Sequence, residues 1–408
     1  MKELLTRYAQ AVVQVGVNLQ PDEVLVVASD VEIAPMTREV VRQGYLAGAK
    51  KVVVLWRDEQ VSLLDLTLGE GRKLLNRDQW EIDCLNTYAD GHAAYVNLIS
   101  GDPEIYASVD PKLLAKTGRL RREQNAKFYK GTQVNDIKWC LVGIPTTTWA
   151  VKVFPDLSPE EALPKLWQAV AHTMRLDLDD TVEEWRAHVE RLHHRCRVLN
   201  DLRLRSLHYT NSLGTDLVVK LPRDYVFAGG SELSSKGCEF VANMPTEEVF
   251  SAPHKYGVDG KVVASMPLFH NGARIENFGL EFKDGRVVNY WADKGLDVLK
   301  EIVDTDEGSH YLGEVALVPF ASTVRDLDTL FLDTLFDENA SCHLALGSAY
   351  PTCVKGGENM SEEELDKAGI NTSHTHVDFM LGTADLSIVG EDEQGNSHVI
   401  FEQGNFAI

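Results

Sequence analysis

The stretch EVLVVASDVEIAPMTREVVRQGYLAGAKKVVVLW, residues 23–56, decides the fold class of the N-terminal half. It begins with a short apolar run from Glu23 to Ala28. A helical stretch from Ala34 to about Ala47 follows, is ended by Gly48, and leads into a second apolar run from Lys51 to Trp56. Two buried-type strands joined by a helix form a βαβ unit, which implies parallel strands and a right-handed crossover. We therefore predict an α/β N-terminal domain with a largely parallel sheet.

The sequence around this unit extends the same pattern. Residues 3–16 have apolar positions at helical spacing, residues 94–99 and 139–144 are further strand candidates, and a helix is predicted from Asp110 to Thr117, ended by Gly118. No glycine-rich phosphate loop follows the first strand, and the residues there, Ser29-Asp30-Val31-Glu32, would repel phosphate. A scaffold or dimerisation domain is therefore favoured over a nucleotide-binding domain.

A helical region marks the predicted join between two domains. Ser158-Pro159-Glu160-Glu161 has the cap, proline and acidic residues of a helix start, and helical spacing continues from Thr181 to about Leu199. We place the boundary here, giving domains 1–195 and 196–408. The cluster His193-His194-Arg195-Cys196 is not read as a metal site, because neighbouring helical residues point in different directions.

After Asn200, helical spacing of apolar residues gives way to alternating stretches. Asp-Gly pairs at 259–260 and 284–285 lie between alternating stretches at 261–265, 280–282 and 286–291, a pattern typical of β-hairpins. We therefore predict an α+β C-terminal domain rich in antiparallel strand.

Composition narrows the class of protein. A chain of 408 residues suits two domains, and 40 basic against 62 acidic residues give a formal net charge of −22, which argues against nucleic acid as a partner. No apolar run approaches the roughly 20 residues of a membrane span, and the N-terminus is predicted to be a helix rather than a signal peptide. The six cysteines contain no C-x-x-C pair, so we expect reduced thiols and a cytoplasmic protein.

Carboxylates and imidazoles gather among apolar residues between Glu301 and Asp378, where a lone buried charge is costly and a metal ion would compensate it. His376-Val377-Asp378 is predicted to be a strand, whose period of two places His376 and Asp378 on one face. The pair could bind one ion together, or form only a hydrogen bond. His374 shares that face, and its part in a site stays open.

Two other acidic positions allow more than one interpretation. Glu314 opens the apolar run 315–318, and taken alone it is expected to be solvated at a sheet edge. Glu247 and Glu248 are adjacent, so in an extended segment they point to opposite faces and only one can reach a metal site.

Two further side chains are candidates nearby. His343 lies in a segment predicted to be helical or a tight turn, beside Cys342, which we interpret as a packing residue. Tyr350 precedes Pro351, which restricts its backbone, and its phenol either donates a hydrogen bond to an oxyanion or packs beneath a loop.

Several long segments carry a resemblance to a known family. They are GVNLQPDEVLVV (16–27), WAVKVFPDLSPEEALPKLW (149–167), NMPTEEVFSAP (243–253), DTDEGSHYLGEVALVP (304–319), LFDENASCHLALGSAYP (335–351) and HVDFMLGTADLSIVG (376–390). The chain resembles the thermophilic-type metalloaminopeptidases, the family of aminopeptidases T, S and PepS. The resemblance covers essentially the whole chain.

The resemblance implies a site and an activity. The implied metal ligands are Glu248, Glu314, His343, His376 and Asp378. Five ligands exceed the need of one tetrahedral zinc, so two divalent ions (zinc, cobalt or manganese) are expected to share them. Glu314 would bridge the ions or accept a proton from the attacking water, and Tyr350 would stabilise the oxyanion. The expected substrates are peptides with a free N-terminus, and a homodimer is expected.

Two alternatives remain open at this point. One is a dinuclear metal amidohydrolase that uses the same ligands on another class of substrate. The other is a protein in which the metal stabilises the fold and catalyses nothing. The identity of the metal, the preferred N-terminal residue, and a role for Glu247 in the site stay open as well.

Overall fold

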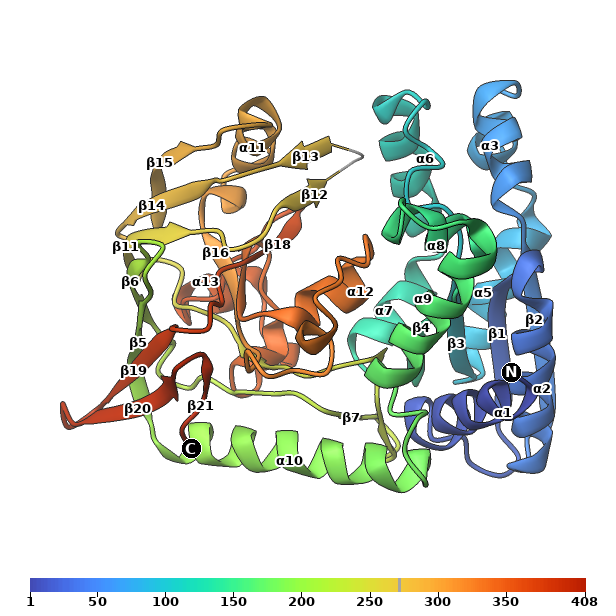
Figure 1. The fold of residues 1–408 in the computed structure, drawn as a ribbon, viewed down its shortest axis with the longest axis horizontal. Helices are drawn as coiled ribbons and strands as arrows, with labels where there is room; N and C mark the ends of the chain where they lie inside the picture. The colour runs from blue at the N-terminus through green and yellow to red at the C-terminus, as the bar shows by residue number, and fades with distance from the viewer. Residues whose placement is uncertain (271–272) are drawn as a thin grey trace. The chain divides into compact units, whose positions relative to one another are not determined.

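The computed structural model describes residues 1–270 and 273–408, and the chain divides into two compact units (Figure 1). The first unit consists of Met1–His188, Ser231–Pro245 and Leu330–Leu335; the second consists of Val189–Gly230, Thr246–Thr329 and Phe336–Ile408. A parallel sheet organises the first unit and antiparallel sheets organise the second. The predicted fold class, an α/β region and an α+β region rich in antiparallel strand, is confirmed.

The sheet of the first unit has five parallel strands in the order β2-β1-β3-β4-β9. Its strands are β1 (Val24–Asp30), β2 (Lys51–Arg57), β3 (Ala94–Ile99), β4 (Trp139–Gly143) and β9 (Asn243–Met244). Helix α2 (Ala34–Leu46) connects β1 to β2, which confirms the βαβ unit. Residues 25–30 of β1 are all buried, as expected for a parallel strand covered on both faces.

Helices account for most of the remaining first unit. They are α1 (Lys2–Ala11), α3 (Glu59–Thr67), α4 (Arg72–Leu75), α5 (Gln79–Asp90), α6 (Pro111–Gln124), α7 (Ala126–Gln133), α8 (Thr147–Val153), α9 (Pro159–Thr173) and α10 (Thr181–Asp201), which continues into the second unit. Ser158 and Glu161 form a capping box at α9, as predicted. Within the described residues, no helix is long and apolar enough to cross a membrane.

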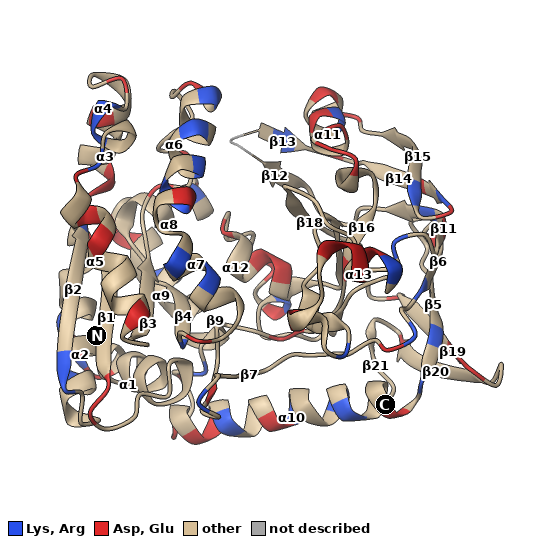
Figure 2. Ribbon diagram, turned by 180° about the vertical axis from the view of Figure 1, so that it is seen from behind, with Lys and Arg blue, Asp and Glu red and all other residues tan. Residues whose placement is uncertain are grey.

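Helix α6 differs from its prediction. It runs through Gly118 to Gln124 instead of ending at Gly118, because one interior glycine costs only about 1 kcal/mol relative to alanine. Figure 2 shows that Lys and Arg positions recur along the ribbon of α6, although the chain as a whole is acidic.

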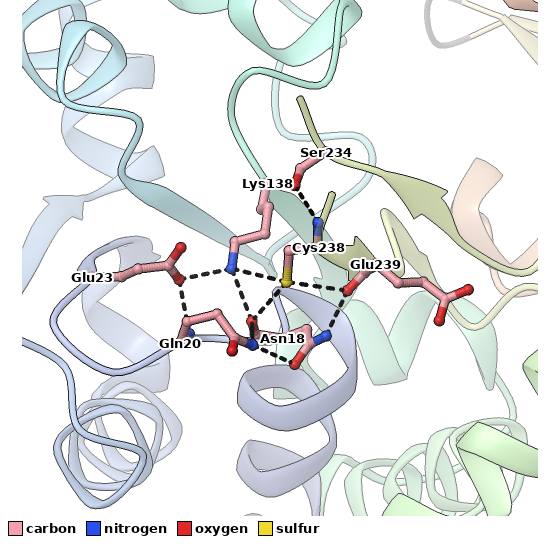
Figure 3. A network of polar contacts seen from close by, with 7 residues as sticks. All are labelled: Asn18, Gln20, Glu23, Lys138, Ser234, Cys238 and Glu239. Atoms are coloured by element: carbon pink, nitrogen blue, oxygen red, sulfur yellow. Dashed lines mark hydrogen bonds and ion pairs between the residues drawn. The ribbon is translucent and has the colours of Figure 1, made fainter. Parts of the chain in front are cut away.

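A segment from the C-terminal half of the sequence belongs to the first unit. The hairpin β7 (Glu232–Leu233) and β8 (Glu239–Phe240) leads into β9, which pairs with β4. Figure 3 shows the polar contacts that hold this hairpin: Asn18 Nδ2 donates to the carbonyl of Glu239 at 2.7 Å, and Lys138 Nζ contacts Cys238 Sγ at 3.7 Å. The hairpin is therefore bound to residues far away in the sequence.

The second unit contains two antiparallel sheets that position its functional face. The larger has the order β15-β14-β11-β6-β5-β19-β20-β21, and the smaller has the order β10-β16-β17-β18. The larger consists of β5 (Leu204–Thr210), β6 (Asp216–Lys220), β11 (Val258–Val263), β14 (Gly279–Lys283), β15 (Arg286–Trp291), β19 (Ser387–Asp392), β20 (Ser397–Glu402) and β21 (Asn405–Phe406). The smaller consists of β10 (Val249–Ser251), β16 (Leu312–Leu317), β17 (His343–Gly347) and β18 (His376–Met380). The second unit also contains the pair β12 (Leu268–His270) and β13 (Ala273–Ile275) and the helices α11 (Leu296–Val303) and α13 (Glu362–Lys367). Helix α12 (Thr334–Asp337) begins in the first unit and ends in the second.

One of the two predicted Asp-Gly turns is correct. Asp284-Gly285 connects β14 to β15 in a hairpin, with both residues at positive φ. Asp259-Gly260 lies inside β11, so that turn prediction is wrong. A side chain at Gly260 would lie 2.3 Å from the carbonyl oxygen of Asp216 on the neighbouring strand β6. Glycine is needed there for close strand packing rather than for a turn.

The smaller sheet turns one face toward the core of the second unit. Alternate residues of its strands belong to one apolar cluster with residues of the larger sheet and of α11. The members from the smaller sheet are Val249, Leu312, Val315, Leu317, Leu344, Leu346, Val377 and Phe379. Because neighbouring residues of a strand point to opposite faces, the intervening positions of these strands lie on the other face.

Candidate metal centre

The second face of the smaller sheet carries the carboxylates that the sequence singled out. Ala345 on β17 pairs with Glu314 on β16 and with Asp378 on β18. Directly paired residues share a face, so Glu314 and Asp378 flank Ala345 on the face opposite the core.

The two histidines occupy the same face. His376 lies two residues before Asp378 on β18, and His343 lies two residues before Ala345 on β17. Glu248 directly precedes β10, at the edge of this sheet. Four neighbouring strands therefore contribute the five predicted ligands.

Distances between ligand atoms divide these residues into two overlapping groups. His376 Nε2 lies 3.1 Å from Glu314 Oε2 and 3.2 Å from Asp378 Oδ1. His343 Nε2 lies 3.2 Å from Glu248 Oε2 and 4.0 Å from Glu314 Oε1. In each group, Glu248–Glu314–His343 and Glu314–His376–Asp378, the ligand atoms lie within 4.8 Å of one another. Glu314 belongs to both groups and offers one oxygen to each.

Backbone carbonyls orient both imidazoles. The Nδ1 atom of His376 lies 2.7 Å from the carbonyl oxygen of Ser348, and Nδ1 of His343 lies 3.1 Å from that of Ser341. A proton on Nδ1 donates to each carbonyl, so Nε2 of each ring faces the carboxylates and is the nitrogen available to a metal ion. This is the orientation that a metal-binding histidine requires.

The concentration of negative charge shifts the pKa values of the site. Burial, together with the charges of Asp378 and Glu248, raises the pKa of Glu314. Burial lowers the pKa of His343, but contact with Glu248 and the surrounding carboxylates outweigh burial and raise it to about 10. For His376, the carboxylates of Asp378 and Glu314 likewise outweigh burial and raise the pKa to about 11. The face therefore attracts positive charge strongly.

A sixth residue, Glu338, belongs to this environment and was not among the predicted ligands. Burial and the charges of Glu248 and Asp378 raise its pKa well above the ordinary value, which shows that its carboxyl group lies near theirs. Glu338 starts a short 3-10 turn, Glu338–Ala340, just before β17. Its place within the segment LFDENASCHLALGSAYP was the available signal.

The arrangement fits divalent cations. Glu248 Oε2 and Asp378 Oδ1 are buried and make no hydrogen bond of acceptable geometry with any described residue, although each lies near an imidazole. Buried carboxylate oxygens left in this way are costly unless a cation compensates them. First-row divalent ions bind carboxylate oxygen and imidazole nitrogen together.

Two expectations about local structure are wrong. Glu314 is 6% exposed rather than solvated, because β16 is paired on both sides and a β-bulge next to Gly313 precedes Glu314. His343 is not in a helix or turn. The 3-10 turn ends at Ala340, Ser341 is extended at φ −162°, and His343 begins β17.

Other predicted residues lie around the two groups or outside them. The ring of Tyr350 lies 5.8 Å from the imidazole of His376 and is 53% exposed, and partial burial with the charges of Glu314 and Asp378 raises its pKa. Glu247 accepts a hydrogen bond from Thr323 Oγ1 at 2.7 Å and is part of neither group. His374 is also outside both groups, and its backbone N–H donates to Asp306 Oδ2.

Sheet, ligand pattern and buried charge together are typical of a metal-dependent hydrolase, and comparison with known proteins agrees. The chain belongs to the thermophilic metalloprotease family M29, whose model matches residues 1–406. It is 43% identical over 403 residues to aminopeptidase AmpS of Bacillus subtilis, covering 99% of this chain and 98% of that protein. It is 34% identical over 410 residues to aminopeptidase T of Thermus aquaticus, covering 100% and 99%. The solved structure of wild-type AmpT from Thermus thermophilus superposes with a TM-score of 0.92 at 32% identity, with all of both chains covered.

Proposed function

We propose that this protein is a metal-dependent aminopeptidase that removes N-terminal amino acids from peptides, using two divalent ions held on the face of the smaller sheet that carries Glu314 and Asp378. The observation that carries the dinuclear assignment is Glu314, whose two oxygens face two separate ligand groups. Membership of a metalloprotease family with relatives named aminopeptidases supports the reaction class.

Charge balance supports two ions rather than one. Glu248, Glu314, Glu338 and Asp378 contribute four negative charges when ionised, and two divalent cations balance them while both histidines stay neutral ligands. With a single divalent ion, the other two charges would have to be balanced by protons, and a histidine protonated on Nε2 could not bind metal through that nitrogen. Zinc, cobalt and manganese all suit this set of nitrogen and oxygen ligands.

The residues of the chain have distinct proposed roles. When bound, divalent ions lower the pKa of water toward about 7 and polarise a carbonyl group. Glu314 joins the two ligand groups, and His343 and His376 present Nε2 from fixed rings. Glu314 and Glu338 are the carboxylates proposed to accept a proton from the attacking water. Tyr350 donates a hydrogen bond to the oxyanion of the tetrahedral intermediate.

A free N-terminus has a proposed role in substrate binding. When bound, one divalent ion would accept the neutral α-amine of the peptide as a ligand beside the scissile bond. An N-acetylated peptide lacks that group. The test is hydrolysis of a leucyl peptide and of its N-acetyl form, with and without a chelator.

The outcomes separate the alternatives. Cleavage of the free peptide alone, lost with chelator and restored by added metal, supports an aminopeptidase. Equal cleavage of the acetylated peptide would indicate an amidohydrolase of another class. No cleavage, with unfolding on chelation, would indicate a metal that only stabilises the protein.

We further propose a cytoplasmic homodimer, with residues 1–195 as the scaffold and dimerisation domain and 196–408 as the catalytic domain, except that 231–245 and 330–335 belong to the first compact unit. All six cysteines are free thiols, which supports a reducing compartment. The predicted ligands all come from the C-terminal region, which supports the division of labour. Sedimentation of the purified protein tests the dimer.

A further inference from the structure

A cysteine and a buried lysine meet in the first unit, and neither residue belongs to the two ligand groups. Cys238 closes the turn of the β7–β8 hairpin, where its N–H donates to Ser234 Oγ at 3.0 Å and its carbonyl accepts from the N–H of Ser234 at 2.9 Å. Its sulfur lies 3.7 Å from Nζ of Lys138, the residue directly before β4 (Figure 3). The hairpin turn and the start of β4 therefore hold the sulfur and the amine nitrogen close to each other.

The lysine is fixed with its amine against the sulfur. Lys138 is 5% exposed, and its Nζ donates to Glu23 Oε2 at 2.7 Å and to the carbonyl of Asn18 at 2.8 Å. The same Asn18 carbonyl lies 3.7 Å from Cys238 Sγ. The ammonium and the thiol therefore share one acceptor, and neither side chain needs a new rotamer to approach the other.

The thiol of Cys238 is also more exposed than most cysteine thiols of this chain. Cys238 and Cys84 are half-buried, whereas Cys140, Cys196, Cys342 and Cys353 are buried. Burial raises the pKa of Cys196 and of Cys342 to about 12, which keeps both as unreactive thiols. Cys238 keeps part of its surface exposed, and the side chain of Glu23, the partner of Lys138, is 20% exposed.

We propose that Lys138 and Cys238 are a redox modification site, at which peroxide joins Nζ to Sγ through a bridging oxygen atom. The first peroxide converts the thiol to a sulfenic acid and releases one water. Glu23 accepts the proton of the ammonium, and a second peroxide joins the sulfenic oxygen to the amine nitrogen and releases two waters. In sum, R–SH, R′–NH₂ and two H₂O₂ give R–S–O–NH–R′ and three H₂O. Sulfur and nitrogen each lose two electrons, and these four electrons reduce the two peroxides.

The link would have a structural consequence. It joins the start of β4 to the β7–β8 hairpin, which precedes β9 and the Glu247-Glu248 pair in the chain. A covalent bond between positions 138 and 238 closes a long loop of the unfolded chain and so stabilises the folded state. Four thiol equivalents of reductant return the thiol and the amine with one water, so the modification is reversible.

The test uses the full-length protein and hydrogen peroxide. After treatment, removal of peroxide and alkylation of remaining thiols, intact mass and tryptic peptides are measured. We expect a mass gain of one oxygen less two hydrogens, loss of tryptic cleavage after Lys138, and a peptide containing both residues that separates on reduction. The unfolding temperature of the treated protein should rise and should return on reduction.

Variants complete the test. Lys138→Arg keeps a positive charge for Glu23 and Asn18 but has no neutral amine, so we expect a sulfenic acid at Cys238 without a link. Cys238→Ser should show neither the mass change nor the rise in unfolding temperature. Cys84→Ser should form the link and gain unfolding temperature as the unsubstituted protein does. The proposal is overturned if Cys238 stays unmodified, if it is oxidised while trypsin still cleaves after Lys138, or if the linked peptide lacks the added oxygen.

Discussion

Replacing Gly313 by alanine should weaken metal binding through the backbone, although Gly313 itself binds nothing. A Cβ atom there would lie 2.4 Å from the carbonyl oxygens of both Gly347 and Ser348. Ordinary carbon–oxygen contact begins near 3.4 Å, so these carbonyls must move by about 1 Å. The Ser348 carbonyl is the acceptor that orients His376 at 2.7 Å, and Glu314 directly follows the substituted residue. One substitution thus displaces parts of both ligand groups.

The magnitude follows from these contacts. Overpacking against backbone costs about 1–3 kcal/mol of stability. Loss of the hydrogen bond that orients a ligand histidine typically costs 10–100-fold in metal affinity, or about 1.4–2.8 kcal/mol. Manganese titration by calorimetry and urea denaturation of the Gly313→Ala variant measure the two effects.

A matched glycine gives the opposite expectation. Nothing lies within 4 Å of a Cβ built on Gly118, which is inside α6. Gly118→Ala should raise stability by about 0.5–1 kcal/mol and leave manganese affinity unchanged. The reasoning fails if Gly313→Ala binds manganese as tightly as the unsubstituted protein, or if Gly118→Ala loses affinity to the same extent.

Three further substitutions test other parts of the account. Tyr350→Phe should lower kcat by about 10²–10³ with metal content unchanged, because only an oxyanion donor is lost; a variant with full kcat would remove Tyr350 from the mechanism. Glu338→Gln removes one of the four charges and should weaken binding of one ion, seen as lower metal content after dialysis; unchanged content and activity would place Glu338 outside the site. Burial raises the pKa of Asp333 to about 6 from 3.8, so the folded state binds its proton more tightly and loses stability as pH rises from about 4 to about 6. At about 1.4 kcal/mol per pKa unit, Asp333→Asn should gain up to about 3 kcal/mol at pH 8 and nothing at pH 3, measured by urea denaturation; equal effects at both pH values would contradict the shift.

Local periodicity predicted the structural features that depend on the residues of a single segment. The alternation in His376-Val377-Asp378 placed both side chains on one face of a strand, and the strand is β18. The βαβ pattern of residues 23–56 gave the parallel order of β1 and β2. The capping residues at Ser158 likewise predicted the start of α9.

Features that depend on distant pairing could not be read in this way. Glu314 looked solvated because its burial comes from β10 and β17, which lie far away in the sequence. The short strand β9 pairs with β4, although about 100 residues of the sequence separate it from Gly143, where β4 ends. Gly260 was predicted to lie in a turn because the close approach of the β6 backbone, which requires a glycine there, is not visible in the local sequence.

Glu338 shows the limit of reasoning from the sequence at the site itself. A glutamate before a short turn is usually solvated or a helix cap, and nothing local distinguishes it. Only the proximity of Glu248 and Asp378 raises its pKa, and that proximity arises from the fold. In the proposed centre, the carboxylate of Glu338 supplies one of the four negative charges that balance two divalent ions.

The central claim is that Glu314 is shared by two divalent ions. The most direct measurement is metal content by elemental analysis of the purified protein, the Glu248→Gln variant and the Glu314→Gln variant, each loaded with manganese and dialysed. We expect about two ions per chain in the unsubstituted protein, about one in Glu248→Gln, and almost none in Glu314→Gln. One ion in the unsubstituted protein, or equal losses in the two variants, would contradict it.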